Sequence, residues 1–461
     1  MNAPRILAAS LLLASPILGQ NVTRDPFPPL EAAEGVIRVG FREFARLPEI
    51  DGVPARMMIL IPEPGTQNVL VNDMRGPIYR ISADGRSVTR YVDVNDSTWG
   101  VHVQSRGRER GVQSFAFHPQ FHEQGTPGYG KFYTWSDFTT NTNEPDYRPG
   151  GGGNTHHTVL HEWTARTPGA ASYDGEAPRE LLRLEQPFAN HNGGQIGFNP
   201  LVRPGDPDFG LLYVGVGDGG SGGDPFNQAQ NMASPFGKIL RIDPMGRNSP
   251  NRKYGIPADN PFVGQAGALG EIYAIGLRNP QRFAWDPANG AMYVSDIGQN
   301  IVEELSPVTK GANLGWNVWE GSFRYAGREG VDTSNPRGDE AMTFPIAEYD
   351  HSDPILINRA AATGVIVVRN GTIPQLRNRI LFGDMPSGEI FHVSADQVPD
   401  GGHDEIRRVL LNQNGQARTF LEVIRGVNPS ATRADLRFGT GPNGQIFLLN
   451  KADGVIRVLT P

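Results

Sequence analysis

The sequence contains no cysteine, which excludes disulfides, thiolate metal sites and cysteine nucleophiles together. It also has no basic stripe, since 49 acidic residues outnumber 42 lysines and arginines and give a formal net charge of −7. Nucleic acid is therefore not an expected partner. Helical periodicity is nearly absent after the first twenty residues, which favours an all-β fold.

Long hydrophobic runs are confined to the N-terminus. Residues 1–5 carry a positive charge, residues 6–18 form an apolar run, and Gly19 and Gln20 follow. This pattern predicts a signal peptide over residues 1–20 and a periplasmic or secreted protein. A membrane anchor is the alternative, but the run is shorter than the ~20 residues that a spanning helix needs. No later segment is apolar enough to span a membrane.

Glycine and proline are abundant, with 57 and 38 residues, and they are spread between short apolar runs. The recurring unit is a strand, a turn containing Pro, Asp, Asn or Gly, and a second strand. Such pairs occur at residues 57–61 with 68–72, 115–117 with 131–136, 195–198 with 211–216, 283–285 with 291–295, and 436–438 with 445–449. Repetition without intervening helices favours a β-propeller or a double-sheet sandwich.

A propeller accounts best for the number of strands and for long polar loops, such as residues 217–233, that could converge on one axis. No linker divides residues 30–461, so we expect them to form a single domain. Residues 36–44 near its start and 454–459 near its end could pair and close the ring.

A histidine in an open turn is the first candidate for chemistry. His191 stands in Asn-His-Asn-Gly-Gly, directly before a predicted strand. Histidine titrates near neutral pH and can take a proton from an alcohol. The plain alternative is a turn histidine that bonds only to backbone.

The glycine-rich loop after the next strand holds Asp218 and Asp224. Asp218 could orient His191 and stabilise its imidazolium, as the acidic member of a triad does. Alternatively, the two carboxylates could ligate Ca²⁺ together with backbone carbonyls. A simple turn is the third interpretation.

Two later segments combine polar groups suited to an anion and to a cation. Arg278, Asn279 and Gln281 place a guanidinium and two amides together, which suits carboxylate or quinone oxygens, although an arginine in a structural ion pair is equally consistent. A loop at residues 295–299 precedes Glu303 and Glu304 and fits either a calcium site or a solvated acidic turn.

Several of these stretches together resemble the glucose/sorbosone dehydrogenase family, which includes soluble PQQ glucose dehydrogenase, aldose sugar dehydrogenase and the propeller of hedgehog-interacting proteins. The matching segments are residues 111–121 (GVQSFAFHPQF), 191–200 (HNGGQIGFNP), 212–220, 237–244 (GKILRIDP) and 271–321. The resemblance covers most of residues 50–460. It implies a six-bladed β-propeller that holds PQQ and calcium on its axial face.

The resemblance also implies a role for each site residue. His191 matches the base that takes the proton from the C1 hydroxyl of a sugar, and Asp218 matches its acidic partner. Arg278, Asn279 and Gln281 match residues that contact PQQ, and Glu109 stands where the family has a glutamine near the cofactor. The carbonyls of Gly298 and Gln299 match ligands of the catalytic calcium. Glu304 and the carbonyl of Leu314 match a second, structural calcium.

The chain departs from the family pattern in its cations. Gln195 stands where family enzymes have an arginine. The loops at residues 384–387 and 434–437 should supply basic residues for the three PQQ carboxylates, but only Arg437 or nearby Arg359 could do so. Because unpaired carboxylates are costly to desolvate, this shortage predicts weak PQQ binding.

Three functions follow from these observations. The leading one is a PQQ- and calcium-dependent oxidoreductase that oxidises an aldose, or a related alcohol or aldehyde, by hydride transfer to the quinone and passes electrons to a periplasmic acceptor. The second is a calcium-dependent lactonase or hydrolase on the same scaffold. The third is a non-catalytic propeller that binds a carbohydrate or a protein loop.

Overall fold

The computed structural model describes residues 21–139, 143–153 and 155–461, so the predicted signal peptide lies outside the described residues. Within these residues the regular secondary structure is almost wholly β-strand, with one short α-helix, α1 (Phe420–Arg425). Three single-turn 3-10 helices cover Ser97–Trp99, Gly327–Glu329 and Pro374–Leu376. No helix in the described ranges has the length and apolarity needed to cross a membrane.

Most strands fall into successive four-stranded groups in which neighbours along the chain pair antiparallel. The first three groups are β3 (Met57–Pro62), β4 (Val69–Asp73), β5 (Pro77–Ile81) and β6 (Val88–Asp93); β7 (Val112–Phe117), β8 (Lys131–Phe138), β9 (His156–Thr164) and β10 (Arg179–Gln186); and β11 (Ile196–Phe198), β12 (Leu212–Val216), β13 (Lys238–Ile242) and β14 (Ile272–Ile275). The next two are β15 (Pro280–Trp285), β16 (Met292–Asp296), β17 (Val302–Val308) and β21 (Ala347–Asp350); and β22 (Ala362–Val368), β23 (Arg379–Asp384), β24 (Ile390–Ser394) and β25 (Arg407–Gln413).

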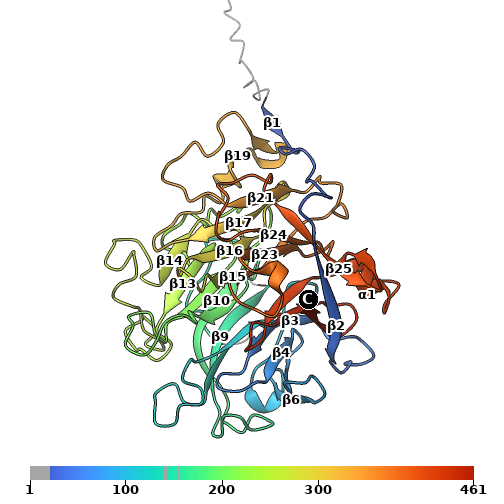
Figure 1. Ribbon diagram of the computed structural model, residues 1–461. Helices are drawn as coiled ribbons and strands as arrows, with labels where there is room; N and C mark the ends of the chain where they lie inside the picture. The colour runs from blue at the N-terminus through green and yellow to red at the C-terminus, as the bar shows by residue number, and fades with distance from the viewer. Residues whose placement is uncertain (1–20, 140–142, 154) are drawn as a thin grey trace, which may run out of the picture.

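The last group joins the two ends of the chain. It contains β27 (Arg437–Thr440), β28 (Ile446–Leu449), β29 (Val455–Thr460) and the N-terminal β2 (Ile37–Arg46). Strand β2 runs antiparallel to β29, with Phe41 opposite Leu459, and lies beside the C-terminus in Figure 1. The predicted pairing of the two ends is therefore confirmed.

The strand pairs predicted from the sequence are also confirmed. Strand β3 pairs with β4, β7 with β8, β11 with β12, β15 with β16 and β27 with β28, all antiparallel. The remaining strands form additions to this plan: β26 (Gln416–Arg418) pairs with β25, and a small sheet combines β1 (Val22–Thr23), β18 (Trp319–Glu320), β19 (Phe323–Tyr325) and β20 (Val331–Asp332).

The core lies between neighbouring groups, because each sheet buries both of its faces. In the third group, Val214 and Leu240 pack with Trp135 of the preceding group. Tyr213 and Ile239, one position earlier on the same strands, belong instead to the cluster that contains residues of the next group. Alternate side chains of a strand point to opposite faces, so near-continuous apolar runs are what such packing requires.

Candidate active site

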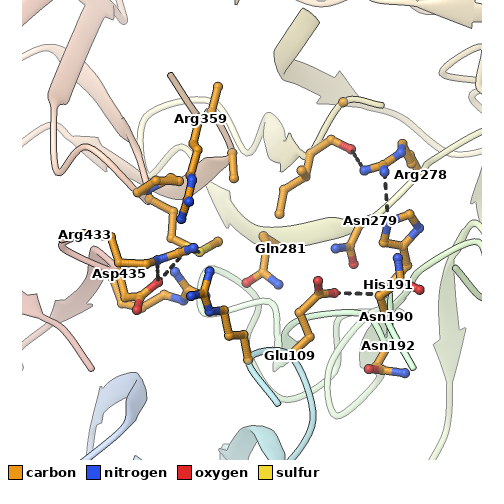
Figure 2. Close-up of a pocket in the computed structure, with 18 of the residues that line it drawn as sticks. Glu109, Asn190, His191, Asn192, Arg278, Asn279, Gln281, Arg359, Arg433 and Asp435 are labelled. Atoms are coloured by element: carbon orange, nitrogen blue, oxygen red, sulfur yellow. Dashed lines mark hydrogen bonds and ion pairs between the residues drawn. The ribbon is translucent and has the colours of Figure 1, made fainter. Parts of the chain in front are cut away.

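A candidate site is a pocket of about 510 Å³ lined by loops at the ends of strands from different groups. Glu109 precedes β7, His191 precedes β11, Arg278 precedes β15, and Gly298 follows β16. The fold therefore brings together side chains that are far apart in the sequence, as the propeller interpretation expected. Figure 2 shows His191, Arg278 and Asn279 on one side of this pocket.

His191 is held by contacts to its ring and to its backbone. Its Nδ1 lies 2.7 Å from Oδ1 of Asp218, and its Nε2 lies 2.9 Å from an Nη of Arg278. Because a carboxylate only accepts and a guanidinium only donates, Nδ1 must carry the proton and Nε2 must hold the lone pair. The imidazole is thus neutral, with its basic nitrogen beside Arg278.

Glycines allow the close approach that places His191. A Cβ on Gly194 would lie 2.1 Å from the carbonyl oxygen of Pro280, and one on Gly217 would lie 2.2 Å from that of His191. Any larger residue at either position would force these backbone segments apart. His191 itself has φ of 55°, and its N–H donates to Oε2 of Glu109 at 2.9 Å. Glu109 thus fixes the turn that carries the histidine.

Asp218 is almost fully buried and uses both carboxylate oxygens. Besides His191, Oδ1 accepts from the N–H of Gly220 at 2.9 Å, and Oδ2 accepts from Nε1 of Trp316 at 2.9 Å. Burial opposes ionisation, but the hydrogen bond and charge interaction with His191 and the charge of Arg278 lower the pKa of Asp218. The carboxylate therefore stays ionised beside the imidazole.

The hydrogen bonds of Asp218 and Asp224 bear on the three interpretations of the glycine-rich loop. Oδ1 and Oδ2 of Asp224 accept from the N–H groups of Gln228 and Ala229, both at 2.8 Å. Its carboxylate therefore shapes its own turn, and that of Asp218 is taken by His191 and Trp316. The geometry favours the triad-like pairing over a calcium site made by Asp218 and Asp224.

Asp296, the last residue of β16, binds the backbone of the segment that contains Arg278. The carboxylate of Asp296 accepts from the N–H groups of Arg278 and Asn279 at 2.8 and 2.6 Å. The guanidinium also donates to Oε1 of Gln299 and to the carbonyl of Ile297. Oδ1 of Asn279 is buried and has no partner among the residues that the structure describes, and Gln281 lines the pocket nearby. The three residues predicted to contact a cofactor thus lie together.

The opposite wall is strongly cationic, which corrects the expected shortage of basic residues. Arg359 and Arg433 face the His191 side across the pocket, with Glu109 and Gln281 between the two sides (Figure 2). The cationic residues lining the whole pocket are Arg108, Arg278, Arg359, Arg433, Arg437 and Lys451. The carboxylates lining it are Glu109 and Asp435, and Arg433 donates to Asp435 at 2.6 Å. Basic residues therefore outnumber acidic ones in the lining, although burial and then the charge of Arg437 lower the pKa of Lys451 well below its usual value.

Two of the four predicted calcium ligands lie at this pocket. Gly298 and Gln299 line it, in a loop whose successive N–H groups donate to Oε1 of Glu320 at 2.8 to 3.1 Å. The other two, Glu304 and Leu314, are buried and are not among its lining residues. The predicted catalytic and structural calcium sites are therefore separate places in the fold.

The surroundings of Glu304 suit a cation. Burial, followed by the charge of Asp296, raises the pKa of Glu304 well above its usual range, and Glu348 and Glu320 add to the effect. Oε2 of Glu320 is buried and has no hydrogen-bond partner in the described part of the chain. Among the described residues, no three His, Asp or Glu side chains converge as a metal site would. A cation near Glu304 would thus need main-chain carbonyls, as predicted for Leu314.

The site contains several residues that were not predicted from the sequence. Trp316 reaches Asp218 from 98 positions away, and Lys451 donates to the carbonyl of Arg108 from 343 positions away. His351 also lines the pocket, with Nε2 2.7 Å from Oε1 of buried Glu303. Trp316 lies in residues 271–321, the segment that resembles the family, and this resemblance could have pointed to Trp316. Neither Lys451 nor His351 lies in a segment that was matched to the family.

Comparison with known proteins agrees with this architecture. The HIPL1 protein of Arabidopsis thaliana is 29% identical over 405 residues, which cover 80% of this chain and 55% of that protein. Aldose sugar dehydrogenase YliI of Escherichia coli is 25% identical over 291 residues, covering 61% of this chain and 63% of the relative. This chain thus spans little more than half of the length of HIPL1.

A solved structure shares the fold at low sequence identity. The PQQ-bound form of aldose sugar dehydrogenase from Streptomyces coelicolor superposes with a TM-score of 0.58 at 20% identity, over 91% of this chain and 96% of that one. The family model for glucose/sorbosone dehydrogenase matches residues 54–420, which include His191, Asp218 and Arg278. The chain therefore belongs to the glucose/sorbosone dehydrogenase family.

Proposed function

We propose that this protein is a PQQ- and calcium-dependent dehydrogenase that oxidises an aldose, or a related alcohol or aldehyde, at C1. The observation that carries the proposal is the pairing, in one pocket, of the His191–Asp218 dyad with a wall of cations. A neutral imidazole held by an ionised carboxylate is suited to accept a proton. A cationic wall facing it is suited to hold a polyanionic cofactor.

The charge of the pocket fits PQQ, which carries three carboxylates. Arg359 and Arg433 would pair with these groups, and Lys451 would donate a hydrogen bond to them. Arg278, Asn279 and Gln281 would contact the cofactor near His191. The buried, unpartnered Oδ1 of Asn279 is one group that a ligand would satisfy. When bound, PQQ supplies an electrophilic quinone that accepts the hydride from C1 of the sugar.

Residues of the protein accept the proton of the substrate hydroxyl and stabilise the charge that forms. Nε2 of His191 is the acceptor, and the hydroxyl takes the position at which an Nη of Arg278 now donates. The ionised Asp218 stabilises the imidazolium that forms, and Nε1 of Trp316 holds the second oxygen of that carboxylate in place. Arg278, displaced from Nε2, remains beside the site as a fixed positive charge.

Calcium would occupy two places. The carbonyls of Gly298 and Gln299 would hold one ion at the pocket, beside the cofactor. Glu304 and the carbonyl of Leu314 would hold the other. The buried, unpartnered Oε2 of Glu320 is a further oxygen that a cation at this place would satisfy. Removal of calcium should therefore lower both cofactor affinity and thermal stability.

The order of the strand groups and the N-terminal residues bear on the architecture and the location of the protein. We propose that the four-stranded groups are the six blades of one propeller domain over residues 30–461, supported by their consecutive order and by the pairing of β2 with β29. Residues 1–20 would direct export to the periplasm or the medium. The substrate is a small molecule, and an acceptor in the same compartment would reoxidise the cofactor.

The test is titration of purified, calcium-loaded protein with PQQ, followed by absorbance of the quinone and then by its reduction with a panel of aldoses. We expect saturable binding and sugar-dependent reduction. Arg359→Gln should weaken PQQ binding by ~5- to 10-fold, because one pocket cation is lost. Arg86→Gln, a change at a side chain that is 88% exposed, should leave the affinity unaltered.

An absence of binding at micromolar PQQ would overturn the proposal. Calcium-dependent hydrolysis of a lactone without cofactor would then indicate the hydrolase, and ligand binding without turnover would indicate a binding propeller.

A further inference from the structure

Two buried arginines lie beside the pocket, and the proposed reaction uses neither of them directly. Arg437 lines the pocket, whereas Arg282 lines a second cavity and bonds to Met58 and Gln281, which both line the pocket. Arg282 on β15 and Arg437 at the start of β27 are 4% and 2% exposed. Arg282 donates to the carbonyl of Met58 at 2.6 Å and to both oxygens of Gln281. Arg437 donates to the carbonyl of Leu436 at 2.8 Å. Every acceptor of these bonds is an uncharged carbonyl oxygen.

The strand pairing places the two guanidiniums near each other. Strands β27 and β3 lie side by side in parallel, with Gly439 opposite Leu60, and Met58 on β3 lines the same pocket as Arg437. The carbonyl of Met58 is the one that receives the bond from Arg282. In agreement, burial and then the charge of Arg437 lower the pKa of Arg282 well below its usual value.

Nearby carboxylates compensate this pair only in part, since the charges of Asp435 and Glu109 favour the cationic form of Arg437. Neither arginine forms an ion pair in the part of the chain that the structure describes, and Nε of each is buried without an acceptor. Asp435, the acidic residue with the largest effect on Arg437, already pairs with Arg433. Adjacent buried cations that lack a full counter-charge are strongly unfavourable unless an anion joins them.

We propose that Arg282 and Arg437 form a binding site for a single negative charge beside the pocket. Two sources have this chemistry, a free halide ion and a carboxylate group of a molecule held in the pocket. Arg437 lines the pocket, so a small anion would enter from there. The site goes beyond the proposed function, because a halide would bind without cofactor or substrate.

The test uses the full-length, PQQ-free protein and compares its melting temperature in sodium chloride and in sodium isethionate, a bulky sulfonate that is neither a halide nor a carboxylate, at equal ionic strength. Chloride should raise the melting temperature saturably, by about 2 °C or more, because it binds only the folded state. Arg282→Met should abolish this rise, because the variant keeps the side chain's length but not its charge.

A matched control and a second variant keep the test decisive. Arg86→Met removes an exposed arginine and should retain the full chloride effect. Arg437→Met should lose the effect in the same way as Arg282→Met, and it serves if the first variant does not fold. Equal melting temperatures of the wild-type protein in the two salts would overturn the proposal, as would a full chloride effect in both methionine variants.

Repeating the measurement with saturating PQQ distinguishes the two sources. Loss of the chloride effect would support the site and identify a cofactor carboxylate as its occupant in the loaded protein. A persistent effect would support a separate halide position. Failure of PQQ to bind would overturn only the dehydrogenase, because the chloride effect is measured without the cofactor.

Discussion

At the scale of single residues, the hydrogen-bond partners of His191 define which of its ring nitrogens carries the proton. Asp218 can only accept at Nδ1 and Arg278 can only donate at Nε2, so the ring is neutral and has one available lone pair. A histidine alone in a turn would have no such constraint. The sequence pointed to His191 and Asp218 as a pair, but only the distances define the tautomer.

The first prediction concerns His191→Asn. Turnover of the PQQ-loaded protein should fall by ~100-fold or more, because the proton acceptor is removed. Asparagine is preferred to alanine, since it tolerates the positive φ of 55° at this position. The melting temperature should stay within about 2 °C of the wild type, as measured by calorimetry. Strong destabilisation with little loss of rate would instead assign His191 a purely structural role.

At the scale of elements, strand β9 shows how burial on both faces affects titratable residues. All of its residues except Thr164 are buried, including His156, His157 and His161. Burial lowers the pKa of His161 to about 4, and its Nδ1 has no hydrogen-bond partner within residues 21–139, 143–153 and 155–461. The histidine is therefore neutral in the folded protein at every pH above that value.

This depressed pKa predicts acid sensitivity. An unfolded histidine has a pKa near 6.5, so the unfolded chain binds more protons between about pH 6.5 and pH 4, and acid favours unfolding in that window. His161→Gln should reduce the pH dependence of unfolding free energy there by up to ~1.4 kcal/mol per pH unit. Chemical denaturation at several pH values measures this slope. His102→Asn, at an exposed histidine, is the control and should leave the slope unchanged.

At the scale of the whole molecule, the N-terminal strand β2 links the last group of strands to the one before it. It pairs antiparallel with β29 and parallel with β25, and Val39 on it is 1% exposed in a core cluster. Such a strand covers an edge that would otherwise offer unpaired N–H and C=O groups to another chain.

Val39→Asp should therefore destabilise the protein by about 3 kcal/mol or more, because it buries an unpaired carboxylate, and it should promote aggregation. Arg38→Asp introduces the same charge at the neighbouring exposed position and should change stability by less than about 1 kcal/mol. Denaturant unfolding and size-exclusion chromatography measure both effects. Equal behaviour of the two variants would contradict the importance of this strand for the fold.

The sequence by itself determined the all-β fold, the strand pairs and the set containing His191, Asp218 and Arg278. Short apolar runs, turn residues and contiguous motifs are local features, so they can be read along the chain. Only the tertiary structure showed the cationic wall, the bond from Trp316 to Asp218 and the buried pair Arg282 and Arg437. These features join loops and strands from distant parts of the chain, as when Lys451 bonds to the carbonyl of Arg108 across 343 positions. No local sequence pattern predicts such a contact, because the contact depends on how separate strand groups pack together.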